Sequence, residues 1–148
     1  MSLFPSPETL APSPAAKKRT RRSADTRHLA PDTKHSAVRE EIWRVYNECN
    51  NDLQCPWSFG KHDGILKRVL ATAPNWDVRR WHTCILNRFA SEDENLAEDP
   101  ARWMPRLPSY AVQPLNRFGK LDKIPQECWA RHRRLCDRYW EIHPESGH

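Results

Sequence analysis

The sequence predicts an all-α protein. It would consist of a small orthogonal helical domain over residues 32–120, a disordered N-terminal arm over residues 1–31 and a C-terminal amphipathic helix over residues 121–148. Three observations favour this fold class: apolar residues recur at helical spacing, no segment alternates like a β-strand, and the chain has 13 prolines but only 4 glycines. The small number of glycines relative to prolines also argues against a glycine-rich phosphate-binding loop and against a barrel of many strands.

The N-terminal arm contains few residues that could join a core. Five of the 13 prolines fall in it, and Phe4 is its one aromatic residue. Such a segment buries too little apolar surface to offset a backbone entropy cost of about 1–2 kcal/mol per residue, so we expect it to be disordered. The arm places five cations within six positions, namely Lys17, Lys18, Arg19, Arg21 and Arg22.

The first expected helix follows Ser36, a suitable N-cap, and ends at Asn50-Asn51-Asp52. Its apolar stripe comprises Val38, Ile42, Val45, Tyr46 and Cys49. Next, Gln54-Cys55-Pro56-Trp57 is expected to be extended, because a proline disfavours the α conformation in the residue before it.

The second expected helix is capped by Ser58 and stopped by Pro74. Its buried face comprises Ile65, Leu66, Val69, Leu70 and Ala73. The third helix would start at the cap Asp77 and run to about Phe89. Its stripe comprises Val78, Trp81, Ile85 and Phe89, at positions i, i+3, i+7 and i+11.

An acidic loop over residues 91–100 separates these helices from the rest of the domain. Asp99-Pro100 has the form of a cap followed by a first helical residue, which predicts a short turn carrying Trp103. Further prolines confine the chain to short turns as far as Gly119, and Pro125 then opens a helix to about His143.

Charge is unevenly distributed along the 148 residues, whose net charge is +5. Residues 1–36 and 101–148 each carry +4, whereas residues 92–100 carry −5. The cationic arm could therefore bind a polyanion such as DNA, fold back onto the acidic loop, or serve only as a solubilising tail.

No run approaches the roughly 18 apolar residues of a membrane span, and residues 1–14 lack the apolar stretch of a signal peptide. We therefore expect a cytoplasmic protein with no membrane contact.

The C-terminal helix offers a second candidate surface for nucleic acid. Its cations at helical spacing are Arg131, Arg133, Arg134 and Arg138. They could follow the phosphates of a nucleic acid, or they could form only a solvated helix face.

The five cysteines form no CxxC pair, and reduced thiols are expected. Cys128, His132 and Cys136 are spaced four apart, as metal ligands can be. However, at 1.5 Å rise per residue the two cysteines lie about 12 Å apart along a helix, so one ion could take only one adjacent pair. Cys49, Cys55 and His62 would have to supply the remaining ligands of a zinc site. We therefore interpret Cys128, His132 and Cys136 as one face of a helix, and we expect no cofactor.

Catalytic signatures are missing as well. The sequence contains no GxSxG, HExxH, Walker or GxGxxG motif, so we do not expect an enzyme.

A series of short motifs runs through residues 32–120. They are Asp32-x-x-His35-x-x-x-Arg39, Cys55-Pro56-Trp57, Leu66 with Leu70, Pro74-Asn75-Trp76, Asn87-Arg88-Phe89, Pro100-Ala101-Arg102-Trp103-Met104-Pro105, Tyr110-Ala111 and Pro114-Leu115-x-Arg117-Phe118-Gly119. In this order they resemble a helical segment of phage and prophage replication proteins of the replisome-organiser kind. The resemblance implies a helical module without catalytic residues. In those proteins a winged-helix DNA-binding domain often precedes the segment, and here the basic arm stands in that place.

These observations predict a non-enzymatic accessory protein of phage or prophage DNA replication or regulation. The arm would contact nucleic acid without sequence specificity, because a cationic segment positions a protein on phosphates and does not read bases. The helical domain would bind a replication protein such as a helicase loader or primase. The alternative is a protein-interaction adaptor that does not bind DNA.

Overall fold

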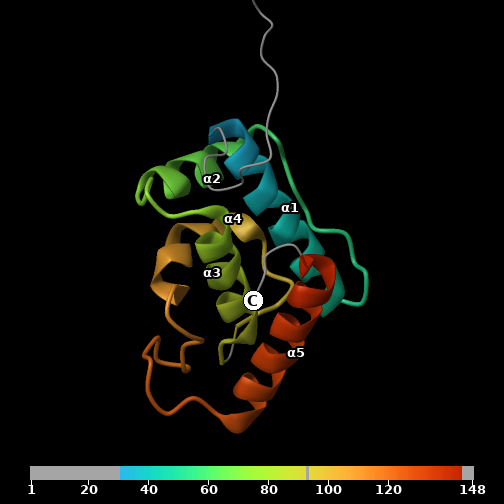
Figure 1. Cartoon of the computed structure of the whole chain (residues 1–148), viewed down its shortest axis with the longest axis vertical. Coiled ribbons are helices and arrows are strands. Elements are labelled where there is room, and N and C mark those ends of the chain that lie inside the picture. The colour runs from blue at the N-terminus through green and yellow to red at the C-terminus, as the bar shows by residue number, and fades with distance from the viewer. Residues whose placement is uncertain (1–30, 93, 145–148) are drawn as a thin grey trace, which may run out of the picture. The chain divides into compact units, whose positions relative to one another are not determined.

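The computed structural model describes residues 31–92 and 94–144, with side chains from Thr33 onward. Every regular element in this part of the chain is helical, which confirms the all-α prediction (Figure 1). The elements are α1 (Pro31–Cys49), α2 (Lys61–Ala71), α3 (Val78–Ala90), α4 (Pro100–Trp103), the 3₁₀ helix η3 (Met104–Tyr110) and α5 (Gln126–Ile142). The five cations of the arm, which are predicted to contact nucleic acid, lie outside the described residues.

Helix α3 forms the centre of the core, where it packs against α1, α5 and η3 (Figure 1). Three of the four residues of its predicted stripe are confirmed as core, since Trp81, Ile85 and Phe89 are all 0% exposed, whereas Val78 in the first turn is half-buried. The predicted cap is also present: the Asp77 side chain accepts a hydrogen bond from the Arg80 N–H at 2.9 Å. Residues 84–91 are all buried, so the second half of α3 is enclosed on every side.

Helix α1 starts at Pro31, five residues before the predicted cap, so Ser36 lies inside the helix. Its first turns are fixed by contacts distant in sequence. Lys34 Nζ donates to the carbonyl of Trp76 at 2.9 Å, and His35 Nε2 donates to the carbonyl of Asp63 at 3.1 Å. Val38, Ile42, Val45 and Tyr46 of the predicted apolar stripe are buried, Cys49 at its end is half-buried, and the helix ends where expected.

Helix α2 starts three residues after the predicted cap Ser58, because residues 58–60 form a turn that leads into it. Ser58 still serves the helix start: its Oγ accepts from the Lys61 N–H at 3.4 Å, and its own N–H donates to His62 Nδ1 at 2.8 Å. This is a reciprocal arrangement like a capping box, with a histidine where glutamate is usual.

The segment after α4 is tied to the end of α3. Asp99 caps α4, as predicted, by accepting from the Ala101 N–H at 2.8 Å. Further along, the Leu115 N–H donates to Ser91 Oγ at 2.9 Å, and the Glu92 N–H donates to the Leu115 carbonyl at 2.9 Å. Residues 111–117 therefore have a fixed position on the domain.

Helix α5 follows Pro125 and buries only a narrow stripe, formed by Cys128, Leu135 and Tyr139. Its other faces are exposed or half-buried, including most of its arginines. None of the helices in residues 31–92 and 94–144 combines the length and the apolar character needed to cross a bilayer.

Candidate nucleic-acid interface

Two of the four arginines predicted on α5 project freely into solvent. Arg133 and Arg134 are exposed, and neither forms an ion pair with any other residue of the described part of the chain. Exposed guanidinium groups without an internal carboxylate partner remain available to phosphate oxygens, which they can bind in a bidentate manner.

The other two arginines are already engaged. Arg138 forms ion pairs with Glu48 at 3.3 Å and with Glu141 at 3.0 Å, and hydrogen bonds to these carboxylates raise the pKa of its guanidinium. Arg131 is half-buried beside Cys128. Burial raises the pKa of the Cys128 thiol, and the hydrogen bond from Arg131 partly opposes this effect. The four arginines therefore do not form one uniform surface.

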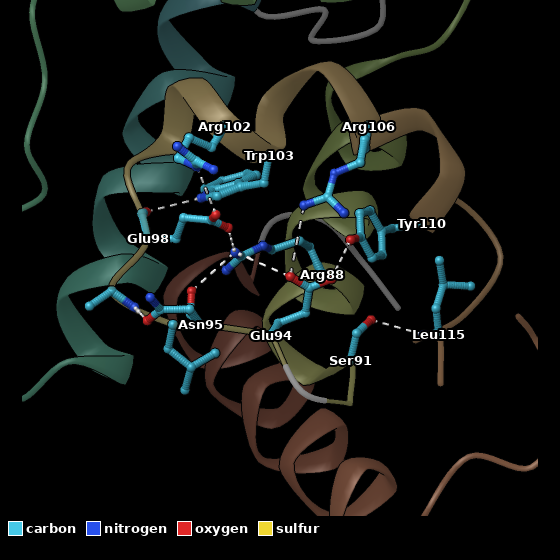
Figure 2. Close-up of polar contacts among 12 residues, drawn as sticks. Arg88, Ser91, Glu94, Asn95, Glu98, Arg102, Trp103, Arg106, Tyr110 and Leu115 are labelled. Atoms are coloured by element: carbon cyan, nitrogen blue, oxygen red, sulfur yellow. Dashed lines mark hydrogen bonds and ion pairs between the residues drawn. The ribbon is translucent and has the colours of Figure 1, made fainter. Parts of the chain in front are cut away.

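Two carboxylates of the acidic loop pair with a buried arginine of α3 (Figure 2). Arg88 is 0% exposed, and its Nη2 lies 3.2 Å from Glu98 Oε1 and 3.4 Å from Glu94 Oε1. The guanidinium also lies over the ring of Trp103, 4.5 Å from its centroid. Burial lowers the pKa of Arg88, while the two carboxylates oppose that shift. A buried cation of this kind is stable only with such partners.

Glu94 has a second partner, and the other described carboxylates of the loop have partners too. Glu94 accepts a hydrogen bond from the Tyr110 hydroxyl at 2.6 Å, and Glu92 pairs with Arg117 at 3.1 Å. Burial, together with Glu94, raises the pKa of the Tyr110 hydroxyl well above its usual range. Because the domain itself supplies these partners, the alternative in which the arm neutralises the loop loses its main support.

Asp99, at the end of the loop, interacts with a histidine. The Ser58 N–H donates to His62 Nδ1, so the proton of the neutral ring lies on Nε2, which donates to Asp99 Oδ1 at 2.6 Å. Burial raises the pKa of Asp99, but the hydrogen bonds from His62 and from the Ala101 N–H outweigh it and leave the pKa below its usual value.

A turn at residues 116–120 presents an aromatic side chain that sequence reasoning missed as a functional candidate. Asn116 Oδ1 accepts from the N–H groups of Phe118 and Lys120, both at 2.9 Å. Gly119 has φ +73°, a left-handed conformation that favours glycine. Phe118 is 76% exposed and lines a hollow of about 510 Å³ together with Arg117 and two lysines. An aromatic residue between cations, next to a glycine, was the available signal.

The cysteines and histidines singled out from sequence do not form a zinc site. On α5, Cys136 Sγ lies 3.6 Å from His132 Nε2, but no third ligand joins this pair among residues 31–92 and 94–144. Burial raises the pKa of the Cys49 thiol to about 11 and those of Cys55 and Cys84 to about 12. Thiols with such high pKa values are poor nucleophiles at neutral pH.

One cluster of potential ligands was not predicted. Glu41, His82 and His143 come together within the core, although they are separated by tens of residues in the sequence.

Comparison of the whole chain with known proteins found no match. No family model, no curated protein and no solved structure matches it.

Proposed function

We propose that this protein is a non-catalytic accessory factor of phage or prophage DNA replication or its regulation, acting in the cytoplasm. It contacts nucleic acid without sequence specificity through cationic side chains, and it contacts a replication protein such as a helicase loader or primase through its helical domain. The nucleic-acid surface comprises α5 and the arm residues Lys17, Lys18, Arg19, Arg21 and Arg22.

The observation that carries the proposal is the contrast between the paired and the unpaired cations. Residues 31–144 carry 18 Lys and Arg against 16 Asp and Glu, which is close to balance. Yet Glu94 and Glu98 are held by the buried Arg88, which cannot reach a ligand, while Arg133 and Arg134 remain exposed without a carboxylate. Arg133 and Arg134 are therefore the cations of α5 that remain open to phosphates, on a helix that also exposes Glu127, Asp137 and Glu141.

Two further points support the choice of a replication role. The first is an expectation from the sequence: the motifs of residues 32–120 resemble those of a helical segment of replisome-organiser proteins, which implies action on DNA together with other proteins. In addition, the segment after η3 exposes large apolar side chains: Val112 is 72%, Phe118 76% and Leu121 47% exposed. Exposed apolar groups on a hydrogen-bonded scaffold are suited to a protein partner.

The test is the affinity for duplex DNA of random sequence, measured over a series of salt concentrations for four forms of the full chain. These are the wild type, an arm variant with all five cations replaced by Ala, the double variant Arg133→Ala/Arg134→Ala, and a control. The arm variant should flatten the salt slope by up to about 4.5 and the α5 variant by up to about 1.8, at about 0.9 per lost phosphate contact. A second duplex of unrelated sequence should give the same losses.

The matched control is Arg102→Ala/Arg106→Ala. These two arginines are 75% and 54% exposed, and their loss changes the net charge as much as the α5 double variant does. Their charges are paired with Glu98 and Glu94, so we expect a smaller change in the salt slope than for α5. If both double variants give the same slope, net charge alone explains the binding and the α5 surface has no special part.

The adaptor alternative is favoured by the same exposed apolar segment. It differs from the proposal in its prediction for DNA binding. If the protein is an adaptor, neither the arm variant nor the α5 variant changes the affinity for DNA at any salt concentration.

A further inference from the structure

Three potential metal ligands from three separate elements meet in the core. Glu41 lies on α1, His82 lies on α3, and His143 is the first residue after α5. One ligand atom of each falls within 4.8 Å of the other two. Glu41 and His82 are buried, at 3% and 5% exposure, whereas the His143 side chain is 25% exposed and gives the cluster access to solvent.

His82 is oriented as a metal-binding histidine would be. Its Nε2 lies 3.1 Å from the Ala37 carbonyl, which can only accept, so Nε2 carries the proton. Nδ1 is then left with a lone pair, and the Tyr139 hydroxyl donates to it at 2.9 Å. Metal-ligating histidines typically donate their second ring N–H to a carbonyl or carboxylate in this way, which fixes the tautomer and the ring.

Glu41 is held in place from the opposite side by Arg44. The Arg44 Nη2 pairs with Glu41 Oε2 at 2.5 Å, and its Nε donates to Oε1 at 3.1 Å. The same Oε1 lies 3.2 Å from His143 Nε2. In a tetrahedral zinc site with bonds of about 2.0–2.1 Å, neighbouring ligand atoms are about 3.3 Å apart, so this pair already has the required separation.

We propose that Glu41, His82 and His143 form a binding site for a divalent transition-metal ion of the zinc type. We assign the ligand atoms as Glu41 Oε1, His143 Nε2 and His82 Nδ1, the ring nitrogen of His82 that is not bonded to the Ala37 carbonyl. Two imidazoles and one carboxylate suit Zn²⁺ or Co²⁺ and disfavour Mg²⁺ and Ca²⁺, which prefer oxygen ligands throughout. The proposal does not depend on the nucleic-acid function.

Binding requires only small rearrangements. The ion takes the place of the proton between His143 Nε2 and Glu41 Oε1, and that proton moves to His143 Nδ1 or to solvent. The Tyr139 hydroxyl turns away from His82 Nδ1 or becomes the fourth ligand. The cluster must also contract, because one ligand atom of each residue lies within 4.8 Å of the others, whereas the tetrahedral edge is about 3.3 Å. His143, just past the end of α5 and 25% exposed, is the ligand nearest to solvent.

A bound ion would join α1, α3 and the end of α5. Because it binds the folded chain and finds no assembled site in the unfolded one, it raises the free energy of unfolding in proportion to the logarithm of its concentration above Kd. Zn²⁺ should therefore raise the midpoint of thermal unfolding of the metal-free full chain.

The direct test is titration of the metal-free full chain with Zn²⁺ by calorimetry and with Co²⁺ by visible absorption. We expect one ion per chain and a Co²⁺ spectrum of nitrogen and oxygen ligands, without the charge-transfer band of a thiolate. His143→Ala should weaken Zn²⁺ binding by more than about 100-fold, beyond the usual effect of losing an outer-shell partner. The stabilisation by Zn²⁺ should disappear with it.

The matched control is His132→Ala, the same change at a half-buried histidine of α5 that lies beside Cys136. It should leave the Zn²⁺ affinity unchanged. If His82→Ala fails to fold, Glu41→Gln provides the second ligand variant, with far-UV circular dichroism to verify the fold. The proposal is overturned if the wild type binds no Zn²⁺, if His143→Ala and wild type bind alike, or if a Cys136→Ser or His132→Ala variant abolishes binding.

Discussion

Helices α3 and α5 have similar sequences in kind but opposite roles in the domain. Both carry arginines, cysteines, a histidine and at least one tryptophan. Nine of the 13 residues of α3 are buried, against three of the 17 in α5. The difference arises from their neighbours, because α3 packs against α1, α5 and η3, whereas α5 has one extensive contact in the described part of the chain, with α3.

Arginine therefore has two different roles in these two helices. Arg88 on α3 is enclosed and its charge is used to hold Glu94 and Glu98 in place. Arg133 and Arg134 on α5 keep their charge available to the surroundings. The comparison teaches that an arginine count measures binding capacity only after the internally paired side chains have been set aside.

The comparison predicts its largest effect at Trp81. Trp81→Ala removes a fully buried side chain from the centre of α3 and should cost about 3–5 kcal/mol of unfolding free energy. Urea unfolding monitored by circular dichroism measures this loss. Phe118→Ala, at a site 76% exposed, is the aromatic control and should change stability by less than about 0.5 kcal/mol. Equal losses in the two variants would mean that α3 is not the centre of the core.

The second effect concerns the buried charge. Arg88→Met leaves Glu94 and Glu98 without their main cation and should cost about 3 kcal/mol, at the lower end for a broken buried pair because both carboxylates keep some contact with water. Arg106→Met, at an exposed arginine 4.0 Å from Glu94, should cost less than about 0.5 kcal/mol. Unfolding titrations of both variants in one buffer make the comparison, and a stable Arg88→Met protein would contradict it.

Asp99 provides an intermediate case, because its side chain is 41% exposed. Asp99→Asn keeps the cap but removes the charge that accepts from His62, so we expect a loss of about 1 kcal/mol at pH 7. The pKa of Asp99 is lowered in the folded state, so its contribution is present above the ordinary value of 3.8 and is lost as the pH falls through the folded pKa. The stability difference between wild type and variant should accordingly close at acidic pH. A difference that stays constant down to pH 3 would show that the charge is not responsible.

The smallest effect on stability is expected on the open face of α5. Arg133→Ala/Arg134→Ala should change the unfolding free energy by less than about 0.5 kcal/mol, since neither side chain has an ion-pair partner in the described residues. Thermal unfolding in the absence of nucleic acid measures this change in unfolding free energy. A loss comparable to that of Arg88→Met would show that these arginines support the fold and would remove the distinction between the two helices.

Local patterns in the sequence were sufficient to predict much of the fold. The cap at Asp77, the Asp99-Pro100 start and the Trp81 stripe depend on residues within a few positions of one another, and all three are confirmed. The start of α1 was predicted wrongly, because Lys34 and His35 are held by carbonyls 42 and 28 residues away. No local pattern reports such contacts.

The candidate sites show the same division. The spacing of the α5 arginines was visible in the sequence, but their separation into exposed, paired and half-buried members depends on Glu48, Glu141 and Cys128 around them. The four-residue spacing of Cys128, His132 and Cys136, interpreted from the sequence as a helix face, brings only His132 and Cys136 together. The cluster of Glu41, His82 and His143 was hidden because its members come from three elements that only packing brings together.

The turn at residues 116–120 has a consequence for the rate of association. Asn116 fixes the backbone on both sides of Phe118 through hydrogen bonds to the N–H groups of Phe118 and Lys120. A ligand that contacts Phe118 therefore meets a surface that is already assembled, and only the two side-chain torsions of the ring remain to be ordered. Encounter, and not the folding of a loop, then limits how fast such a ligand binds, and salt changes that rate through the neighbouring Lys120 and Lys123.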